Sequence, residues 1–389
     1  MSDSVQPLIR VAVLQPAVPH YRLGLFDLVA AHAAIEMTVH GSASDGLGVR
    51  TVQPLPSWGR IHGETRVLRP FGRILRWHPG QIAALFRSSP NVVVLHGAAS
   101  NLTSLVAVLI CRLRGIPVVW WTHGGHDVRL SRPAVLLRLL LARLSGGLLL
   151  YTSEEAVQYC RFRLLRNRPV IGLDNGVEYQ AIRNALAAVD AGEVASIRGR
   201  LPASTSLRVL FCGRFTAKAD LPLLISALER CHSSIGAVLI GDGEFLDAMI
   251  VRAQSLLASG RLVLAGRVVG PAALSPYFAA SDVFVYPGDM GLSGIEALAF
   301  GLPVVTHDHE PSQMPETAAL KEGFNSLRFR HRDADDLAAM LNRLDDDRAL
   351  LAMLAANAPT IVAERFDIER SAARFVECVR AVAALRPAR

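Results

Sequence analysis

A glycine-rich turn within residues 286–308 has the composition of a phosphate-binding loop. The stretch reads YPGDMGLSGIEALAFGLPVVTHD, in which an apolar strand-like run ends and a helical segment begins near Leu292. Gly288 and Gly291 let the backbone approach a ligand closely. The N–H groups of Gly291, Leu292 and Ser293 at the helix start would suit a pyrophosphate, because the first N–H groups of a helix lack partners within it.

Glu296 stands one helical turn beyond this start. From there its carboxylate can accept hydrogen bonds from neighbouring ribose hydroxyls. The alternative is an ordinary strand-to-helix turn followed by a surface glutamate, because glycine turns are common in α/β folds. These residues alone leave both interpretations open.

Alternating apolar runs and amphipathic stretches predict the elements that would hold such a turn. Near-continuous Val, Leu and Ile runs separated by helical segments indicate parallel sheets covered by helices on both faces. In such sheets, ligands bind beyond the carboxyl ends of the strands. Strands are expected at 9–16, 91–97, 116–125, 146–153 and 169–177, and again at 207–215, 236–244, 261–268, 282–288 and 302–308.

This pattern predicts an α/β protein with two doubly wound, Rossmann-like domains facing a cleft, and a length of 389 residues fits two domains. We expect an N-terminal domain over 1–178 and a C-terminal domain over 207–370. Residues 179–206 lack strand character and suit a linker helix and loop. A last helix over 371–389 either ends the second domain or returns to the first.

The composition indicates a globular protein, with 51% hydrophobic and 19% charged residues. A membrane-spanning helix needs about 20 nearly uncharged residues. The apolar run 102–111 is too short, and the run 134–150 is interrupted by Arg138 and Arg143. The first residues lack the pattern of a secretion signal. Five dispersed cysteines favour reduced thiols, so we expect a cytoplasmic protein.

The positive charge is concentrated in the first half of the chain. Residues 1–178 hold 19 Arg and 10 Asp or Glu, hence +9, whereas the remainder holds 22 Lys or Arg and 24 Asp or Glu, hence −2. A basic half attracts nucleic acid, anionic lipid or an acidic substrate. Nucleic acid is disfavoured, because only 6% of the residues are aromatic and no reading motif is present.

Five segments in the expected order resemble the retaining glycosyltransferases of family four, which have the GT-B fold. EALAFGLPVV (296–305) is similar to the second half of the family signature. The others are CGRFTAKADLPLLISAL (212–228), LIGDGE (239–244), AGRVVGPAALSPYFAASDVFVYP (265–287) and the hinge-like NGV (175–177). The resemblance covers most of 207–330 and is looser over the first half. It implies transfer of a hexosyl group from a nucleotide-diphosphate donor bound in the second half.

The resemblance assigns the donor diphosphate to a glycine-arginine pair, Gly213 and Arg214, supported by Lys218. Two cations beside a departing diphosphate would offset the charge that grows as the glycosidic bond breaks. The alternatives are an ordinary surface arginine and lysine. Lys218 stands one position earlier than the commonest family spacing, where this chain has Ala219.

The family usually places a first glutamate eight positions before Glu296, where this chain has Gly288. That absence resembles a subgroup associated with surface-polysaccharide assembly. Asp289 can substitute for the glutamate or simply form the turn. The following stretch THDHEPSQMPE also resembles the subgroup, which would place Gln313 and Glu316 at the sugar pocket.

In the first half, the resemblance points to three residues that follow expected strands. His123 ends WWTH and would face the donor sugar, although a histidine there often only caps or packs. His20 and Arg22 lie in PHYRLGLF, where the family has an acceptor-side loop. The implied mechanism is retaining, uses no covalent nucleophile, and requires neither a metal nor another cofactor.

Two basic apolar stretches bear on the acceptor. Residues 66–80 interleave four arginines with Val, Leu, Phe, Ile and Trp, and residues 129–147 alternate arginines with a leucine face. Such stretches can lie on an anionic bilayer or form half-buried helices whose arginines reach solvent. We favour half-burial for 129–147 and membrane contact for 66–80. A glycan or lipid-linked acceptor at the inner membrane face would unite these features.

Two other classes compete with a transferase. A non-catalytic GT-B relative that binds a partner is credible because the first signature glutamate is missing. A Rossmann oxidoreductase would need G-x-G-x-x-G after the first strand, but LQPAVPH contains no glycine.

Overall fold

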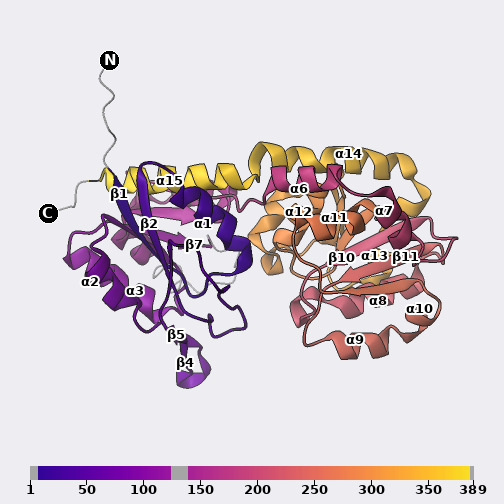
Figure 1. Cartoon of the computed structure of the whole chain (residues 1–389), viewed down its shortest axis with the longest axis horizontal. Helices are drawn as coiled ribbons and strands as arrows, with labels where there is room; N and C mark the ends of the chain where they lie inside the picture. The colour runs from indigo at the N-terminus through magenta and orange to yellow at the C-terminus, as the bar shows by residue number, and fades with distance from the viewer. Residues whose placement is uncertain (1–7, 124–138, 386–389) are drawn as a thin grey trace, which may run out of the picture. The chain divides into compact units, whose positions relative to one another are not determined.

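The computed structural model describes residues 8–123 and 139–385, which form two compact units. The first unit comprises the chain up to Asp174 together with the segment from Ile368 onward, and the second is Asn175–Asp367. Figure 1 shows the chain with its elements labelled. Both units are α/β with a parallel sheet of Rossmann-like type, as the sequence predicts.

The sheet of the first unit has the strand order β3-β2-β1-β6-β7-β8-β9, and all of its pairs are parallel. Its strands are β1 Ile9–Leu14, β2 Ile35–Gly41, β3 Gly59–Ile61, β6 Val92–His96, β7 Val118–Thr122, β8 Gly147–Leu150 and β9 Val170–Gly172. The helices are α1 Leu23–Ala30, α2 Gln81–Ser88, α3 Leu102–Leu113, α5 Ser153–Cys160 and α15 Ile368–Ala383, with short 3-10 turns at His20–Arg22, Pro70–Gly72 and Arg163–Leu165.

Helices cover both faces of this sheet because its strands are apolar on both sides. In β6, Val92 and Val94 join the buried cluster formed with α1 and α15, whereas Val93 and Leu95 join the cluster formed with α2, α3 and α5. Figure 1 shows α1 and α15 on one side of the sheet and α2 and α3 on the other. Alternate side chains of a strand point to opposite faces, so an uninterrupted apolar run has to be covered twice.

The sheet of the second unit has the order β12-β11-β10-β13-β14-β15 and is also parallel. Its strands are β10 Leu207–Cys212, β11 Ile235–Ile240, β12 Leu262–Gly266, β13 Val283–Tyr286, β14 Val304–His307 and β15 Ser326–Phe329. The helices are α6 Tyr179–Ala187, α7 Ala191–Arg198, α8 Leu221–Arg230, α9 Leu246–Arg252, α10 Gln254–Ala258, α11 Pro271–Ala279, α12 Leu292–Phe300, α13 Ala334–Asp346 and α14 Arg348–Arg365, with 3-10 turns η4 Ala217–Ala219, η5 Glu310–Ser312 and η6 Pro315–Ala319.

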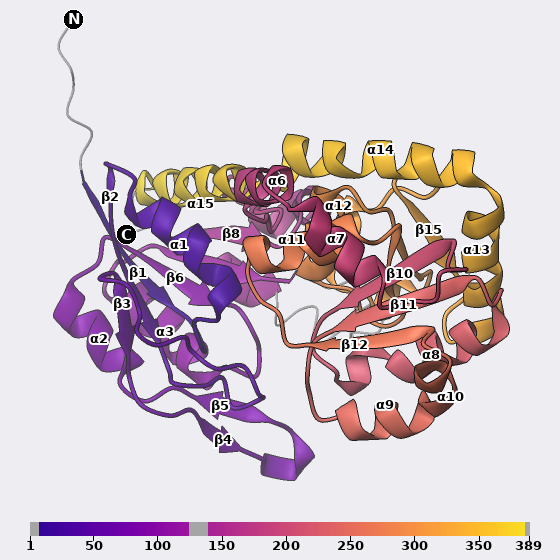
Figure 2. The ribbon, with the colours of Figure 1, turned by 45° about the vertical axis from the view of Figure 1, so that its right-hand side comes forward.

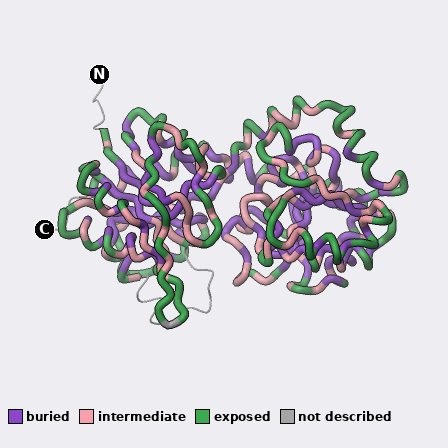
Figure 3. Tube along the Cα trace, turned by 60° about the horizontal axis from the view of Figure 1, so that its bottom comes forward, coloured by how far each residue is buried: buried purple, intermediate pink, exposed green. Residues whose placement is uncertain are grey.

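The order in which strands are added to this sheet reverses between β10 and β13, which are neighbours although two strands separate them in sequence. Helices α8 and α9 lie on one side of the sheet and α12 and α14 on the other (Figure 2). Figure 3 shows buried residues in the interior of each unit and exposed ones around it. Such a reversal is where doubly wound sheets bind ligands.

Residues 179–206, where the sequence suggests a linker helix and loop, are helical. They form α6 and α7, and Ile182 and Leu201 are buried in the second unit's core beside residues of α11 and α12. The Asp190 side chain caps α7 by accepting a hydrogen bond from the backbone of Glu193 at 3.1 Å. The helix α15 lies in the first unit, where Phe375 packs against Trp121.

Residues 66–80 do not form an amphipathic helix. They form an antiparallel hairpin of β4 Arg66–Leu68 and β5 Leu75–Trp77, with a 3-10 turn between the strands. Pro70 and Gly72 interrupt a helix here, and Gly72 takes a φ of 75° that favours glycine. Arg76 is buried, whereas Arg66 is exposed. Much of the stretch 129–147 lies outside the described residues.

Among the described residues, no helix combines the length and apolar composition needed to cross a membrane.

Candidate functional site

Two loops of the second unit pack together at the reversal point. One follows β10 and contains Arg214 and Lys218, and the other follows β13 and contains Gly288 and Asp289. The Asp289 N–H donates to the Lys218 carbonyl oxygen at 3.0 Å. A Cβ atom on Gly288 would overlap that same oxygen, so the glycine permits the close approach.

The G-D-G turn after β11 supports the β10 loop from its other side. The Phe215 N–H donates to the Asp242 carbonyl at 2.8 Å. Gly241 and Gly243 take φ values of 143° and 152°, and a Cβ on Gly241 would overlap the carbonyl oxygen of Gly213. The G-D-G turn therefore fixes the backbone that carries Arg214.

The side chains of Arg214 and Lys218 are exposed, and neither makes a hydrogen bond or ion pair with another described residue. Nearby, α12 begins at Leu292, and its N-cap residue Gly291 provides no side-chain cap. Leu292 and Ser293 at this start are half-buried. Uncapped N–H groups and two unpaired cations at one edge of the sheet together favour the binding of an anion.

Glu296 lies on the first turns of α12 and is half-buried. Burial raises the pKa of its carboxyl to about 7, and repulsion from Glu178 adds to the shift. Carboxyl groups with a shifted pKa are common at binding sites. A ligand that donates hydrogen bonds to Glu296 would favour the ionised form of its carboxyl.

Asp289 lies half-buried in the same loop, and its Oδ1 atom is 3.9 Å from Nε2 of the fully buried His307. The His307 Nδ1 accepts from the His309 backbone at 3.2 Å, so Nε2 carries the proton in the neutral ring. The pKa of the Tyr286 hydroxyl is raised to about 12 by burial and then by Asp289, while Arg214 opposes the shift. Asp289 is therefore placed beside the candidate diphosphate site.

Gln313 is engaged by the loop itself. Its side-chain oxygen accepts from the Met290 N–H at 2.9 Å, and its nitrogen donates to Thr306 Oγ1 at 3.0 Å and to the His307 carbonyl at 3.1 Å. Its role in the structure is to brace the β13 loop against β14. This bracing function was not foreseen from the sequence.

Glu316 lies in η6 and is buried. Its Oε1 accepts from the Asn175 side chain at 2.9 Å, while Oε2 is buried without a hydrogen-bond partner among the described residues.

In the first unit, the residues predicted for the acceptor side lie at the carboxyl ends of the strands. His123 follows β7 and stacks on Tyr151, which follows β8, with ring centroids 3.9 Å apart and planes at 10°. The Arg22 guanidinium lies 4.6 Å from the Trp121 ring centroid. His20 begins the 3-10 turn that holds Arg22, and its side chain is exposed.

Residues 206–347 match the family described as "Glycosyl transferases group 1". The protein is a glycosyltransferase, and this segment is similar to a group 1 domain. Over 345 residues the chain is 28% identical to the D-inositol 3-phosphate glycosyltransferase of Nocardiopsis dassonvillei, covering 81% of this chain and 75% of the relative.

Solved structures support the GT-B fold of this glycosyltransferase. Anabaena HepE in complex with UDP aligns with a TM-score of 0.69 and 17% identity, covering 96% of this chain and 100% of that one. Sucrose-phosphate synthase of Thermosynechococcus elongatus aligns with a TM-score of 0.67 and 17% identity, covering 96% and 98%.

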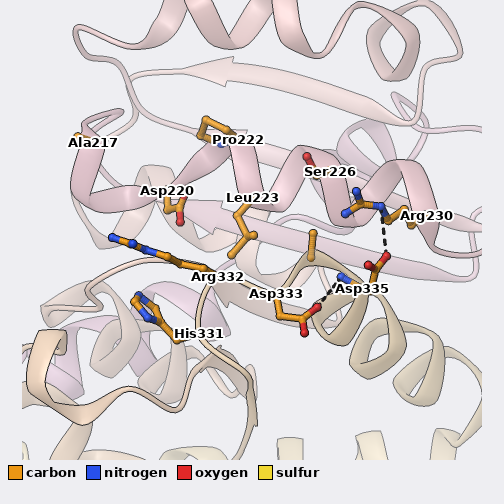
Figure 4. A pocket seen from close by; sticks show the side chains of 11 residues that line it. Ala217, Asp220, Pro222, Leu223, Ser226, Arg230, His331, Arg332, Asp333 and Asp335 are labelled. Atoms are coloured by element: carbon orange, nitrogen blue, oxygen red, sulfur yellow. Dashed lines mark hydrogen bonds and ion pairs between the residues drawn. The ribbon is translucent and has the colours of Figure 1, made fainter.

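A larger open hollow of about 830 Å³ in the second unit is a weaker candidate (Figure 4). It lies between α8 and residues 330–335, where Arg230 pairs with Asp335 at 3.2 Å and Asp333 accepts a hydrogen bond from the backbone of Asp335. None of the residues predicted for the donor lines it.

Two residues of the glycosyltransferase that the sequence did not single out lie at the first sheet's carboxyl edge. His96 ends β6, and Arg76 lies on β5, and both line a hollow that Arg22 and Tyr151 share. The motif VVVLHG has the same form as VVWWTHG, so His96 could have been found by the reasoning that selected His123. Arg76 carried no such signal, because its burial depends on the hairpin.

Proposed function

We propose that this glycosyltransferase moves a hexosyl group from a nucleotide-diphosphate donor, with UDP-sugars the first to test, to a glycan or lipid-linked acceptor. The observation that carries the proposal is the pair of exposed, unpaired cations Arg214 and Lys218 at the edge where α12 begins without a cap. The structurally similar HepE has been solved with UDP and with UDP-glucose, which supports the choice of base.

The donor would lie along the two packed loops of the second unit. Arg214, Lys218 and the N–H groups of Leu292 and Ser293 would hold the diphosphate, because charge-assisted hydrogen bonds are the strongest available to it. Glu296 would accept hydrogen bonds from the ribose hydroxyls. Asp289 and Glu316 would contact the sugar in place of the missing glutamate.

The reaction that we propose is retaining and requires no metal ion. The bond from the anomeric carbon to the phosphate oxygen breaks, and the acceptor oxygen forms the new bond on the same face. The departing phosphate oxygen takes the acceptor proton, so no protein nucleophile is needed. Arg214 and Lys218 then serve to offset the charge that develops on the diphosphate.

Donor binding by the full chain tests this proposal. We expect a panel of UDP-, GDP- and ADP-sugars, with EDTA and then with Mg²⁺, to include one ligand that raises the melting temperature without metal. A ligand at 100 times its Kd adds about 2.7 kcal/mol of stability. Arg214→Ala should weaken that ligand at least tenfold, because one charge-assisted hydrogen bond contributes about 1.5–3 kcal/mol.

Arg252→Ala is the matched control, because Arg252 is an exposed arginine of the same unit that pairs with Glu229. It should leave donor affinity unchanged. If no nucleotide sugar binds, or if both variants weaken binding equally, the donor site does not lie at Arg214.

The β4–β5 hairpin supports a membrane-associated acceptor. Arg66, Arg69 and Arg73 are exposed on it, together with Leu68 and Ile74. We expect the protein to sediment with vesicles containing phosphatidylglycerol at low salt and a triple Arg→Gln variant of the hairpin to remain in solution. Equal sedimentation of both proteins would contradict this part of the proposal.

A further inference from the structure

A small hollow in the first unit lies at the carboxyl ends of β1 and β6, where the order of that sheet reverses. Its volume is about 100 Å³. That space can take one phosphate or carboxylate group. Three polar side chains that line it have buried nitrogen atoms without a hydrogen-bond partner among the described residues: Gln15, Arg76 and His96.

Arg76 is the strongest of these features. Its side chain is only 9% exposed, and a guanidinium has five N–H donors. Among the described residues, Nη2 donates to Ser100 Oγ at 3.1 Å, while Nε is buried without a partner. A charge in such a place is costly for stability unless a ligand or an ion pair compensates it.

The neighbouring carboxylate compensates Arg76 only in part. Asp45 Oδ2 lies 3.8 Å from Arg76 Nη1, which is beyond hydrogen-bond distance. The other oxygen, Oδ1, accepts from the backbone of Leu47 at 2.7 Å and of Val49 at 3.0 Å. The carboxylate is therefore held by its own turn, and Arg76 keeps donors that can reach a ligand.

The other unpartnered groups also suit an anion. The Gln15 side-chain nitrogen is a donor, and the His96 Nδ1 is a buried ring nitrogen. Burial, with added repulsion from Arg76, His123, Arg22 and His78, lowers the pKa of His96 to about 3. Burial thus keeps His96 neutral, and Arg22 and Arg76 add positive charge around the hollow.

We propose that this hollow binds an oxyanion, a phosphate monoester or a carboxylate, that the acceptor carries. Arg76 grips it with its unpartnered N–H groups, and Gln15 and His96 complete the hydrogen bonds. The proposal rests on the proposed function, because it names the class of acceptor for that transfer. The charge of +9 on residues 1–178 would attract such an acceptor.

The test measures anion binding by the full chain with calorimetry. Inorganic phosphate and glycerol 3-phosphate are titrated in the presence of saturating UDP, so that the diphosphate site of the second unit is occupied. We expect both to bind, Arg76→Gln to weaken them at least tenfold, and Arg10→Gln to leave them unchanged. Arg10 is an exposed arginine near the opposite end of β1.

Asp45→Asn provides a second variant with an effect of opposite sign. It removes the negative charge beside Arg76 but keeps the oxygen that the Leu47 and Val49 backbones use. We expect phosphate to bind severalfold more tightly to it than to the wild type. Arg76→Gln should fold with an unchanged or higher melting temperature, because it removes a buried charge that lacks full compensation.

Phosphate binding that ignores both Arg76→Gln and Asp45→Asn overturns the proposal. If UDP does not bind, the proposed function is wrong. Phosphate is then titrated into the Arg214→Ala variant, where its binding tests the anion site separately. Titration with acetate in place of phosphate shows whether the site also binds a carboxylate. Vesicles of phosphatidic acid, compared with phosphatidylcholine, show whether the Arg76-dependent phosphate lies on a lipid or on a soluble acceptor.

Discussion

The carbonyl oxygen of Lys218 occupies the place that a Cβ atom on Gly288 would take. The same oxygen accepts a hydrogen bond from the N–H of Asp289 at 3.0 Å. Two loops on neighbouring strands are thus joined backbone to backbone. The family that this chain resembles usually has its first signature glutamate at the position of Gly288, and here no side chain fits without moving the loop that carries Arg214.

Restoring the glutamate should therefore harm the protein. We expect Gly288→Glu to lower stability by about 3 kcal/mol, because overpacking against a backbone atom forces the chain to shift. It should also weaken UDP-sugar binding, because the shifted loop displaces Lys218. Urea unfolding and calorimetry would measure the two effects.

Gly291→Ala is the control for this change. A Cβ at Gly291 meets no atom within 4 Å, and its φ of −109° is open to alanine. Its stability should stay close to that of the wild type. If Gly288→Glu has the same unfolding free energy as Gly291→Ala, the β10 loop shifts without loss of stability, and the prediction is wrong.

Much of the second unit could be predicted from the sequence. The strands β10, β11, β12, β13 and β14 were expected where they occur, because each is an apolar run that ends at a glycine or polar turn. The first unit was less predictable. Its β2 and the hairpin β4–β5 were not foreseen, since β2 mixes polar residues with apolar ones and the hairpin strands have only three residues each.

The candidate site was predictable where local spacing determines it. Gly291, Leu292, Ser293 and Glu296 follow from a strand, a turn and a helix in succession. The partners of Gln313 and Arg76 were not predictable, because their contacts come from residues distant in sequence. Gln313 bonds residues 23 and 7 positions away, and Arg76 reaches Ser100 across 24 positions. Tertiary packing sets these roles.

The raised pKa of Glu296 makes both stability and donor binding depend on pH. Its folded pKa of about 7 exceeds the ordinary value of 4.5, so the folded state holds its proton more tightly than the unfolded state. Its contribution to stability is full below pH 4.5 and is lost as the pH rises through 7. We expect the stability of Glu296→Gln relative to that of the wild type to increase by about 2–3 kcal/mol between pH 5 and pH 8.

Donor affinity should show the opposite trend. The ionised carboxylate accepts from the ribose hydroxyls, so wild-type affinity should rise with pH through 7, with release of a proton on binding. Glu296→Gln should bind more weakly, with an affinity that is flat over this range. Calorimetry in buffers of different ionisation enthalpy would count the proton, and equal pH profiles for the two proteins would contradict the assignment.

Gln313 should matter for stability and for donor binding together. Gln313→Ala removes its bonds to Met290, Thr306 and His307 and leaves buried groups without partners. We expect a loss of about 2–3 kcal/mol in unfolding free energy and weaker UDP-sugar binding, because the β13 loop loses its brace. Gln180→Ala, which alters an exposed glutamine that donates to Asn184 in the same helix, should change neither quantity.

The stack of His123 on Tyr151 separates two roles for the histidine. If His123 donates a hydrogen bond to the donor sugar, as the resemblance implies, His123→Phe keeps the aromatic stack but should lower kcat for UDP-sugar hydrolysis or transfer by about 10²-fold, the lower end for a positioned polar group. Its affinity for UDP alone should be unchanged, because UDP lacks the sugar. Tyr151→Leu should lower kcat less, since the imidazole remains but loses its support. If His123→Phe retains full kcat while Tyr151→Leu does not, the histidine serves only to pack against Tyr151, and the assignment of His123 to the reaction is wrong.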